Sequence, residues 1–242
     1  FNDVVSNYPL LAAWATPGDP VVISFADLGN KLAGGPGATL SDENALMSLA
    51  GMWDVSVHNG IQYKTEPEAF WSGQLSEYIK YPRDVIKDKI GTCIDTALFF
   101  STLALTQGLN AYIVLMPGHA FSIIELPSGQ LIPVETTTLN NGYTFSQAIE
   151  SGVNTYTNAI NGPYIIIDLQ KYQSIGIIPP ELPELPTDIL TVWNITSPST
   201  SKSLQAGIDS GQTSSDYISF INYAPMWSVT YPSSWSVQQS TS

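Results

Sequence analysis

The segment Cys93–Gln107 carries apolar side chains around nearly its whole circumference when it is wound into an α-helix. A helix with a single apolar stripe lies on a protein surface, whereas a helix that is apolar all round must be covered on every side. Gly108 follows directly and is typical of a helix C-terminus. The sequence therefore predicts that this helix is buried. Its apolar residues are Ile94, Ala97, Leu98, Phe99, Phe100, Leu103, Ala104 and Leu105.

Three strand-like segments follow this helix, at 111–116, 120–126 and 131–135. The sequence 127–130, Pro-Ser-Gly-Gln, is typical of a tight hairpin between the last two. A buried helix beside consecutive short strands favours an α+β fold, in which that helix packs on an antiparallel β-sheet. Further helices are predicted at 41–59, 83–90 and 144–160, and further strands at 21–25 and 164–168.

The chain has 242 residues, enough for one substantial core or for one domain and a smaller piece. The proline-rich segment 178–186 is predicted to be extended. We assign residues 1–186 to the main domain, with its core at 40–170. Residues 187–242 are rich in Pro, Ser and Thr, and are interpreted as a linker with a C-terminal segment. That segment is either a tail or the start of a second β-rich module.

The charge balance excludes a nucleic-acid reader. The net charge is −13 with only 8 Lys and Arg residues, so no basic patch is available to neutralise phosphates. The charged fraction of 12% is about half of the usual share. Neutral polar and aromatic side chains replace the charges, which favours an extracellular or cell-surface location.

Two further signals agree with export. The sequon Asn194-Ile195-Thr196 makes Asn194 a candidate glycosylation site. The chain begins at Phe1 rather than at Met, and no signal peptide is visible, so we expect a processed or shortened form. No uninterrupted apolar stretch reaches the roughly 18 to 20 residues of a membrane span.

Cys93 is the only cysteine, so neither an intramolecular disulfide nor a cysteine-based zinc site can form. The two histidines, His58 and His119, are too few for a typical multi-histidine metal site. No calcium-loop motif is present, and no metal or cofactor is expected. A lone cysteine is either an inert buried side chain or a reactive thiol, and its neighbourhood decides between these.

The sequence places Cys93 at the start of the buried helix, two residues after Gly91. The positive end of the helix dipole and the free N–H groups there favour a thiolate and can hold an oxyanion. His119 begins one strand and Glu135 ends the next, so a hairpin brings both to the same end of the sheet. A nucleophilic thiol needs a base, and the base needs an orienting acceptor. Asp168 is an alternative to Glu135 as that acceptor.

The run from Gly91 to Thr137 resembles the core of the transglutaminase-like superfamily, of the archaeal and bacterial surface type. The likeness rests on a Gly-x-Cys-x-Asp helix start, a His-Ala-Phe strand and an acidic residue followed by Thr. It implies a papain-like arrangement in which Cys93 is the nucleophile, His119 the base and Glu135 the third member. That third residue is usually Asp in the superfamily, so Glu135 departs from the pattern.

The same resemblance implies an oxyanion-hole side chain upstream of the cysteine, and the candidates are Trp71, Gln74, Tyr78 and Tyr81. The implied activity is acyl transfer on amide bonds through a Cys93 thioester. Hydrolysis of a peptide or of a cell-surface polymer is the favoured form. Two alternatives stay open: a transglutaminase that cross-links proteins through an amine acceptor, and a non-catalytic secreted scaffold or binding protein with the same fold. The oligomeric state also stays open.

Overall fold

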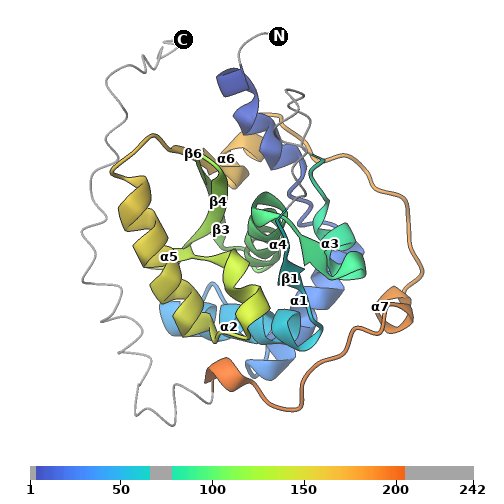
Figure 1. Ribbon diagram of the computed structural model, residues 1–242. Coiled ribbons are helices and arrows are strands. Elements are labelled where there is room, and N and C mark those ends of the chain that lie inside the picture. Colours follow the sequence, from blue (N-terminus) through green and yellow to red (C-terminus); the bar gives the residue numbers. More distant parts are fainter. Residues whose placement is uncertain (1–3, 66–77, 205–242) are drawn as a thin grey trace.

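The structure is a computed structural model that describes residues 4–65 and 78–204. It combines helices with one four-stranded sheet and one two-stranded sheet (Figure 1). None of the helices in these two ranges combines the length and apolar character that crossing a membrane requires. In chain order the elements are η1 (Val4–Ala13), α1 (Pro20–Leu32), α2 (Asp42–His58), β1 (Gln62–Tyr63), α3 (Pro82–Asp88), β2 (Ile90–Gly91), α4 (Cys93–Thr106), β3 (Asn110–Met116), β4 (His119–Glu125), β5 (Leu131–Val134), η3 (Thr136–Asn141), α5 (Phe145–Ala159), β6 (Ile165–Asp168), α6 (Leu169–Ser174) and α7 (Ile189–Val192).

Helix α4 lies in the middle of the molecule, between the sheet and the helices of the N-terminal half (Figure 1). All of its residues from 94 to 104 are buried. Phe99 packs edge-on against Phe25 of α1, with 5.6 Å between the ring centroids. Phe100 packs in the same way against Trp53 of α2, at 5.5 Å. The prediction that this helix is buried is confirmed.

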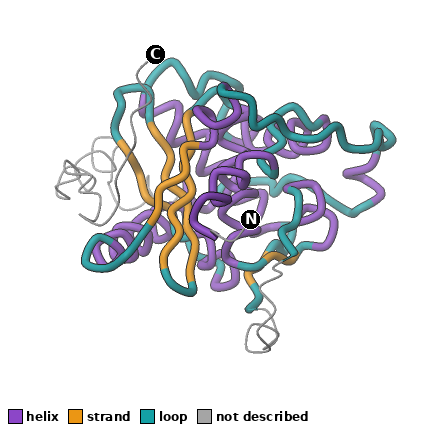
Figure 2. The backbone as a smooth tube through the Cα atoms, turned by 90° about the horizontal axis from the view of Figure 1, so that it is seen from above, coloured by secondary structure: helices purple, strands orange, loops and turns teal. Residues whose placement is uncertain are grey.

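The four-stranded sheet has the order β5-β4-β3-β6, and each neighbouring pair is antiparallel (Figure 2). The β3–β4 hairpin pairs Met116 with His119, and the next pairing sets Ser122 opposite Val134. Strands β3 and β4 pack on α4. The other face carries a small second cluster that includes Phe121 and residues of α5. The α+β prediction, a helix packed on an antiparallel sheet, is confirmed at this level.

Residues 21–25, predicted as a strand, belong instead to helix α1, so this prediction was wrong. Asp19 is the N-cap, and its side chain accepts a hydrogen bond from the N–H of Val21. Pro20 occupies the first helical position, where its missing N–H does no harm. The helix buries one side of the segment and leaves Ile23 40% exposed. The cap and the helical burial pattern outweigh the strand preference of the β-branched residues.

The helices predicted at 41–59 and 144–160 are confirmed as α2 and α5. Each begins at a hydroxyl N-cap, Ser41 and Thr144, whose side chain accepts the N–H of the third residue along. Such a cap is a local signal, because the hydroxyl and the N–H that it accepts lie three residues apart in the chain.

The helix predicted at 83–90 is shorter than expected and ends at Asp88. Lys89 adopts a left-handed conformation with φ of 58°, which stops the helix. The chain then forms β2, and its parallel partner β1 sets Tyr63 opposite Gly91. This pairing lays β1 beside the segment that leads into α4.

The segment 178–186 contains no helix or strand, as predicted, but the residues after it pack on the body. Ile195 is 6% exposed and belongs to the main core. The buried carboxylate of Asp54 in α2 accepts hydrogen bonds from the hydroxyls of Ser201 and Ser203. The stretch interpreted as a linker is thus packed as far as residue 203. Residues 205–242, where the second module was expected, lie outside the described residues.

Helices α1 and α2 cross with their backbones in contact at Gly29 and Gly51. A Cβ on Gly51 would lie 2.2 Å from the carbonyl oxygen of Gly29. We therefore expect Gly51→Ala to lower the free energy of unfolding by about 1–3 kcal/mol, the usual effect of overpacking, as measured by urea denaturation. Gly18→Ala is the control, because a Cβ there meets no atom within 4 Å. Equal stability of the two variants would contradict the tight crossing.

Candidate active site

Cys93 is the first residue of α4, and its free thiol is partly exposed. Thr92 is the N-cap: its hydroxyl accepts the N–H of Asp95, whose carboxylate accepts the N–H of Thr92 in return. The other Asp95 oxygen accepts the backbone N–H of Lys80. Gly91 suits its place, because a Cβ there would come within 2.7 Å of the Asp95 Cβ. These local bonds fix where the helix starts and hold the thiol at its positive end.

His119 is the first residue of β4 and follows a turn in which Gly118 has φ of 74°. The imidazole stacks on Phe121, with 6.2 Å between ring centroids and an interplanar angle of 21°. The His119 side chain is 25% exposed. The ring is therefore supported on one face while solvent still reaches it.

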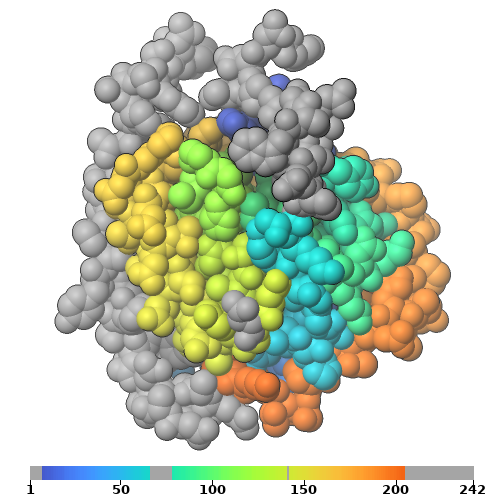
Figure 3. All heavy atoms as spheres, in the orientation of Figure 1, coloured from blue at the N-terminus to red at the C-terminus, as the bar shows by residue number. Residues whose placement is uncertain are grey.

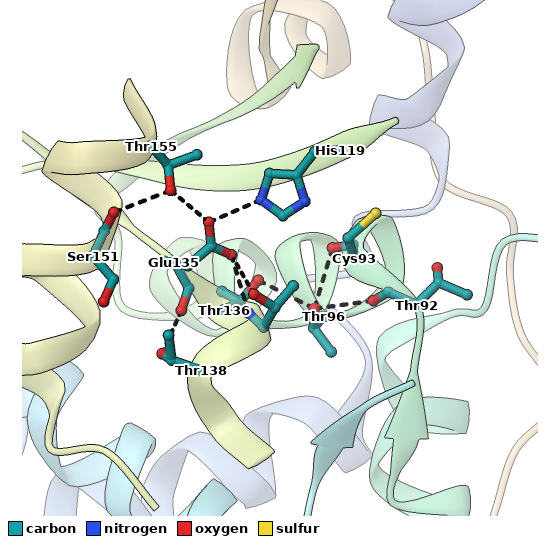
Figure 4. Close-up of polar contacts among 10 residues, drawn as sticks. Thr92, Cys93, Thr96, His119, Glu135, Thr136, Thr138, Ser151 and Thr155 are labelled. Carbon is teal, nitrogen blue, oxygen red and sulfur yellow. Dashed lines mark hydrogen bonds and ion pairs between the residues drawn. The ribbon is translucent and has the colours of Figure 1, made fainter. Parts of the chain in front are cut away.

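Glu135 follows directly after β5, the strand that pairs with β4. Its backbone N–H donates to the carbonyl of Ala148 in α5. Its carboxylate oxygen Oε2 lies 2.8 Å from Nε2 of His119, and the side chain is only 8% exposed. The structure thus brings these two predicted site residues into direct contact (Figure 4).

The other nitrogen of the His119 ring lies on the side of Cys93, away from Glu135 (Figure 4). The neighbouring Cys93, and then the hydrogen bond with Glu135, raise the pKa of His119 from 6.5 to about 10, although burial acts in the opposite direction. The ring therefore carries both of its protons at neutral pH. The N–H at Nε2 faces the Glu135 carboxylate, and the other N–H lies on the side of Cys93 (Figure 4).

Glu135 is held by more than the imidazole. Burial acts to raise the pKa of Glu135, but hydrogen bonds from His119, Thr137 and Thr155 outweigh burial and hold the pKa below its ordinary value. Oε1 accepts the N–H and the hydroxyl of Thr137, at 3.2 and 2.8 Å. Oε2 accepts the hydroxyl of Thr155 at 2.9 Å in addition to the imidazole. About four acceptor positions of a carboxylate are thereby filled, which keeps it ionised and in place.

A buried contact between two hydroxyls connects α4, which carries Cys93, to the segment that follows Glu135. Oγ1 of Thr96 lies 3.1 Å from Oγ1 of Thr136, and both residues are fully buried. The Thr96 hydroxyl also lies within hydrogen-bonding distance of the carbonyls of Thr92 and Cys93. Because Thr136 comes directly after Glu135, this contact connects the two ends of the site beneath the imidazole.

Asp168, the alternative third residue, lies at a different place. Its carboxylate accepts the N–H of Lys171 and caps the short helix α6. Its backbone pairs with Tyr112 at the end of β6. The acid that meets His119 in the structure is Glu135.

The oxyanion-hole candidates are only partly described. Trp71 and Gln74 lie outside the described residues. Tyr78 is 75% exposed, and Tyr81 stacks on Trp14 with 6.2 Å between ring centroids. The N–H of Asp95 is taken by the Thr92 hydroxyl, which leaves the N–H groups of Cys93 and Ile94, at the start of α4 and next to the thiol, as the better-placed donors.

Two side chains that sequence reasoning did not select belong to this neighbourhood. One is Thr155, the hydroxyl partner of Glu135. The other is Tyr63, whose pKa is raised by burial and then by the nearby charges of Cys93 and Glu135. No motif marks either residue. Tyr63 reaches the site through the short pairing of β1 with β2, and Thr155 through the packing of α5, and neither contact is encoded locally.

The glycosylation candidate Asn194 is exposed and lies two residues after the end of α7, with φ of 53°. The next residue, Ile195, is buried, and the hydroxyl of Thr196 lies 3.0 Å from Nε2 of His58. Glycosylation of Asn194 stays a prediction.

Within residues 4–65 and 78–204, no group of three or more His, Cys, Asp or Glu side chains is arranged to hold a metal ion. Comparisons of the chain with models of known protein families, with curated proteins and with solved structures find no match. The transglutaminase-like resemblance therefore rests on the sequence motifs alone.

The charge pair can be tested through the pH dependence of stability, with His119→Gln as the variant. The pKa of His119 is raised in the folded chain. The contribution of His119 to folding stability is therefore fully present below about pH 6.5 and is lost as the pH rises through about 10. The pKa of Glu135 is lowered in the folded chain. The contribution of Glu135 to folding stability is therefore fully present above pH 4.5 and is lost at lower pH. We expect the stability advantage of the wild type to be largest between about pH 4.5 and 6.5 and to shrink toward pH 10. Urea unfolding at a series of pH values measures it, and an advantage that does not vary with pH would refute the pair.

Proposed function

We propose that this chain is a thiol-dependent acyl-transfer enzyme that acts on amide bonds, as a peptidase or amidase. One observation carries the proposal: Nε2 of the His119 imidazole lies 2.8 Å from the Glu135 carboxylate, and the other ring nitrogen lies on the side of Cys93 (Figure 4). A thiol at a helix N-terminus beside an oriented imidazole is the arrangement that covalent acyl transfer requires. The transglutaminase-like resemblance of the sequence supports the same chemistry.

In the first step, the sulfur of Cys93 attacks the carbonyl carbon of the amide and forms a tetrahedral intermediate. The N–H groups at the start of α4 stabilise its oxyanion. The carbon–nitrogen bond then breaks as His119 gives a proton to the leaving nitrogen. A free amine departs, an acyl thioester remains on Cys93, and the neutral imidazole stays anchored to Glu135.

In the second step, water attacks the thioester while His119 takes a proton from it. The carbon–sulfur bond breaks, the carboxylic acid leaves, and the thiolate–imidazolium pair is restored. An amine in place of water would give a cross-linked amide. Hydrolysis is the form we propose, because water needs no dedicated acceptor site.

We further propose that the substrate is a peptide or a cell-surface polymer, and that the protein works outside the cell or on its surface. The surface chemistry supports this: only 12% of the residues are charged, and neutral polar and aromatic residues take their place. The net charge of −13 does not suit a polyanionic substrate.

Alkylation of Cys93 tests the proposal without a known substrate. An ordinary thiol has a pKa of about 8.5, so rapid reaction with iodoacetamide near about pH 6 requires a thiolate held by an imidazolium. We expect this reaction in the wild type and its loss in His119→Ala, with rates measured by mass spectrometry across the pH range.

The matched control for this experiment is His58→Ala, because His58 is exposed and contacts Thr196 instead of Cys93. This variant is expected to react as the wild type does. If Cys93 reacts like a free exposed thiol, and His119→Ala changes nothing, the enzyme proposal fails and a binding or scaffold role is favoured.

The acyl acceptor needs a second experiment, with a mixture of peptides incubated in the presence and absence of a labelled primary amine. We expect cleaved or deamidated peptides, no labelled product, and no reaction at all with Cys93→Ser. Incorporation of the label at a rate above that of hydrolysis would replace the hydrolase proposal with a cross-linking enzyme.

A further inference from the structure

Helix α5 comes very close to strand β5 immediately before the acid of the site. A Cβ on Gly152 would lie 2.5 Å from the carbonyl oxygen of Pro133, so only glycine permits this approach of the two backbones. The backbone N–H of Glu135 donates to the carbonyl of Ala148 in the same helix. The position of α5 relative to Glu135 is therefore fixed by backbone contacts rather than by flexible side chains.

Thr155 lies about one helical turn beyond Gly152. Its hydroxyl oxygen is 2.9 Å from Oε2 of Glu135 and 3.0 Å from the backbone carbonyl oxygen of Ser151 (Figure 4). A hydroxyl has one proton and can donate it to only one of these acceptors at a time. The bond to a charged acceptor is the stronger one. The Thr155 hydroxyl therefore donates its hydrogen bond to the ionised Glu135, and the carbonyl of Ser151 is the alternative acceptor.

We propose that Thr155 is a positioning residue, whose hydroxyl holds the carboxylate of Glu135 against His119 and so keeps the imidazole aligned with Cys93. This inference rests on the proposed acyl-transfer function. A Glu side chain has one more rotatable bond than Asp, so its carboxylate has more freedom to turn away from the imidazole. Thr155 restrains one oxygen of that carboxylate, and Thr137 restrains the other.

The same helix supplies a matched control. Helix α5 runs along the surface of the molecule, where its residues appear in yellow (Figure 3). Thr157 is exposed on this helix, and its hydroxyl donates to the carbonyl of Val153 at 2.8 Å. This is the same bond within the helix that Thr155 can make to Ser151. The two threonines thus differ in the contact with Glu135.

The test compares three variants with the wild type: Thr155→Val, Thr155→Ser and Thr157→Val. Valine keeps the volume of threonine but removes the hydroxyl, and serine keeps the hydroxyl. We expect Thr155→Val to slow the alkylation of Cys93 by iodoacetamide about tenfold near about pH 6, the usual order of effect for a hydrogen bond to a charged group. The loss should fade near about pH 9, where an ordinary thiol ionises without help.

Thr155→Ser and Thr157→Val are expected to react within about twofold of the wild type, because neither removes the bond to the Glu135 carboxylate. Thermal unfolding of each variant is measured in parallel. A purely structural role of Thr155 predicts lower thermal stability with no change in the pH profile of alkylation, and that result would overturn the proposal. So would an equal loss of rate at every pH, or a loss in Thr155→Ser as large as in Thr155→Val.

The failure of this proposal can be told apart from the failure of the proposed function. If the wild type reacts rapidly at low pH, His119→Ala does not, and Thr155→Val matches the wild type, the positioning role is refuted and the acyl-transfer function stands. If the wild type itself lacks the rapid reaction at low pH, both proposals are refuted.

Discussion

The burial of α4 on every side is the constraint on which the rest of the structure depends. A helix without a polar face has to be enclosed, and here β3 and β4 cover one side while α1, α2 and α3 cover the others. Its internal polar groups are satisfied: the Ser101 hydroxyl donates to Ser122 and the Thr102 hydroxyl to the carbonyl of Leu98. At the N-terminal end of this helix, Cys93 is partly exposed, and its thiol is the candidate nucleophile of the site.

Enclosing α4 also decides what surrounds its first turn. In the sheet that covers the helix, the start of β4 and the end of β5 lie at the same end of the strands. This arrangement brings His119 and Glu135 together. Helix α5 then closes on β5 and adds Thr155. The residues of the site thus come from elements that also take part in packing around α4. Hydroxyl contacts such as Thr96 with Thr136 join these elements beneath it.

The parts of this structure that were predictable from sequence are those with local signals. The all-round apolar pattern of α4 and the turn between β4 and β5 are readable within a few residues of each element, and the buried helix and the hairpin were predicted correctly. The strand predicted at 21–25 is a helix, because the Asp19 cap and the burial of one helix face outweigh the strand preference of the β-branched residues. Ser201 and Ser203 are separated from Asp54 by more than half the length of the chain, and no local sequence pattern predicts a contact between them. The same holds for Thr155 at the site.

The transglutaminase-like pattern usually has Asp at the position of Glu135. The contacts of Glu135 offer a physical explanation for the longer side chain. A longer side chain can reach the imidazole from the end of β5, but its carboxylate needs more restraint to stay there. Thr137 restrains one oxygen from the adjoining turn, and Thr155 restrains the other from α5. An Asp at this position would carry its carboxylate about one carbon–carbon bond closer to the backbone, about 1.5 Å, away from both His119 and Thr155. Glu135, Gly152 and Thr155 therefore form one consistent solution, in which the length of the acid and the close approach of the helix depend on each other.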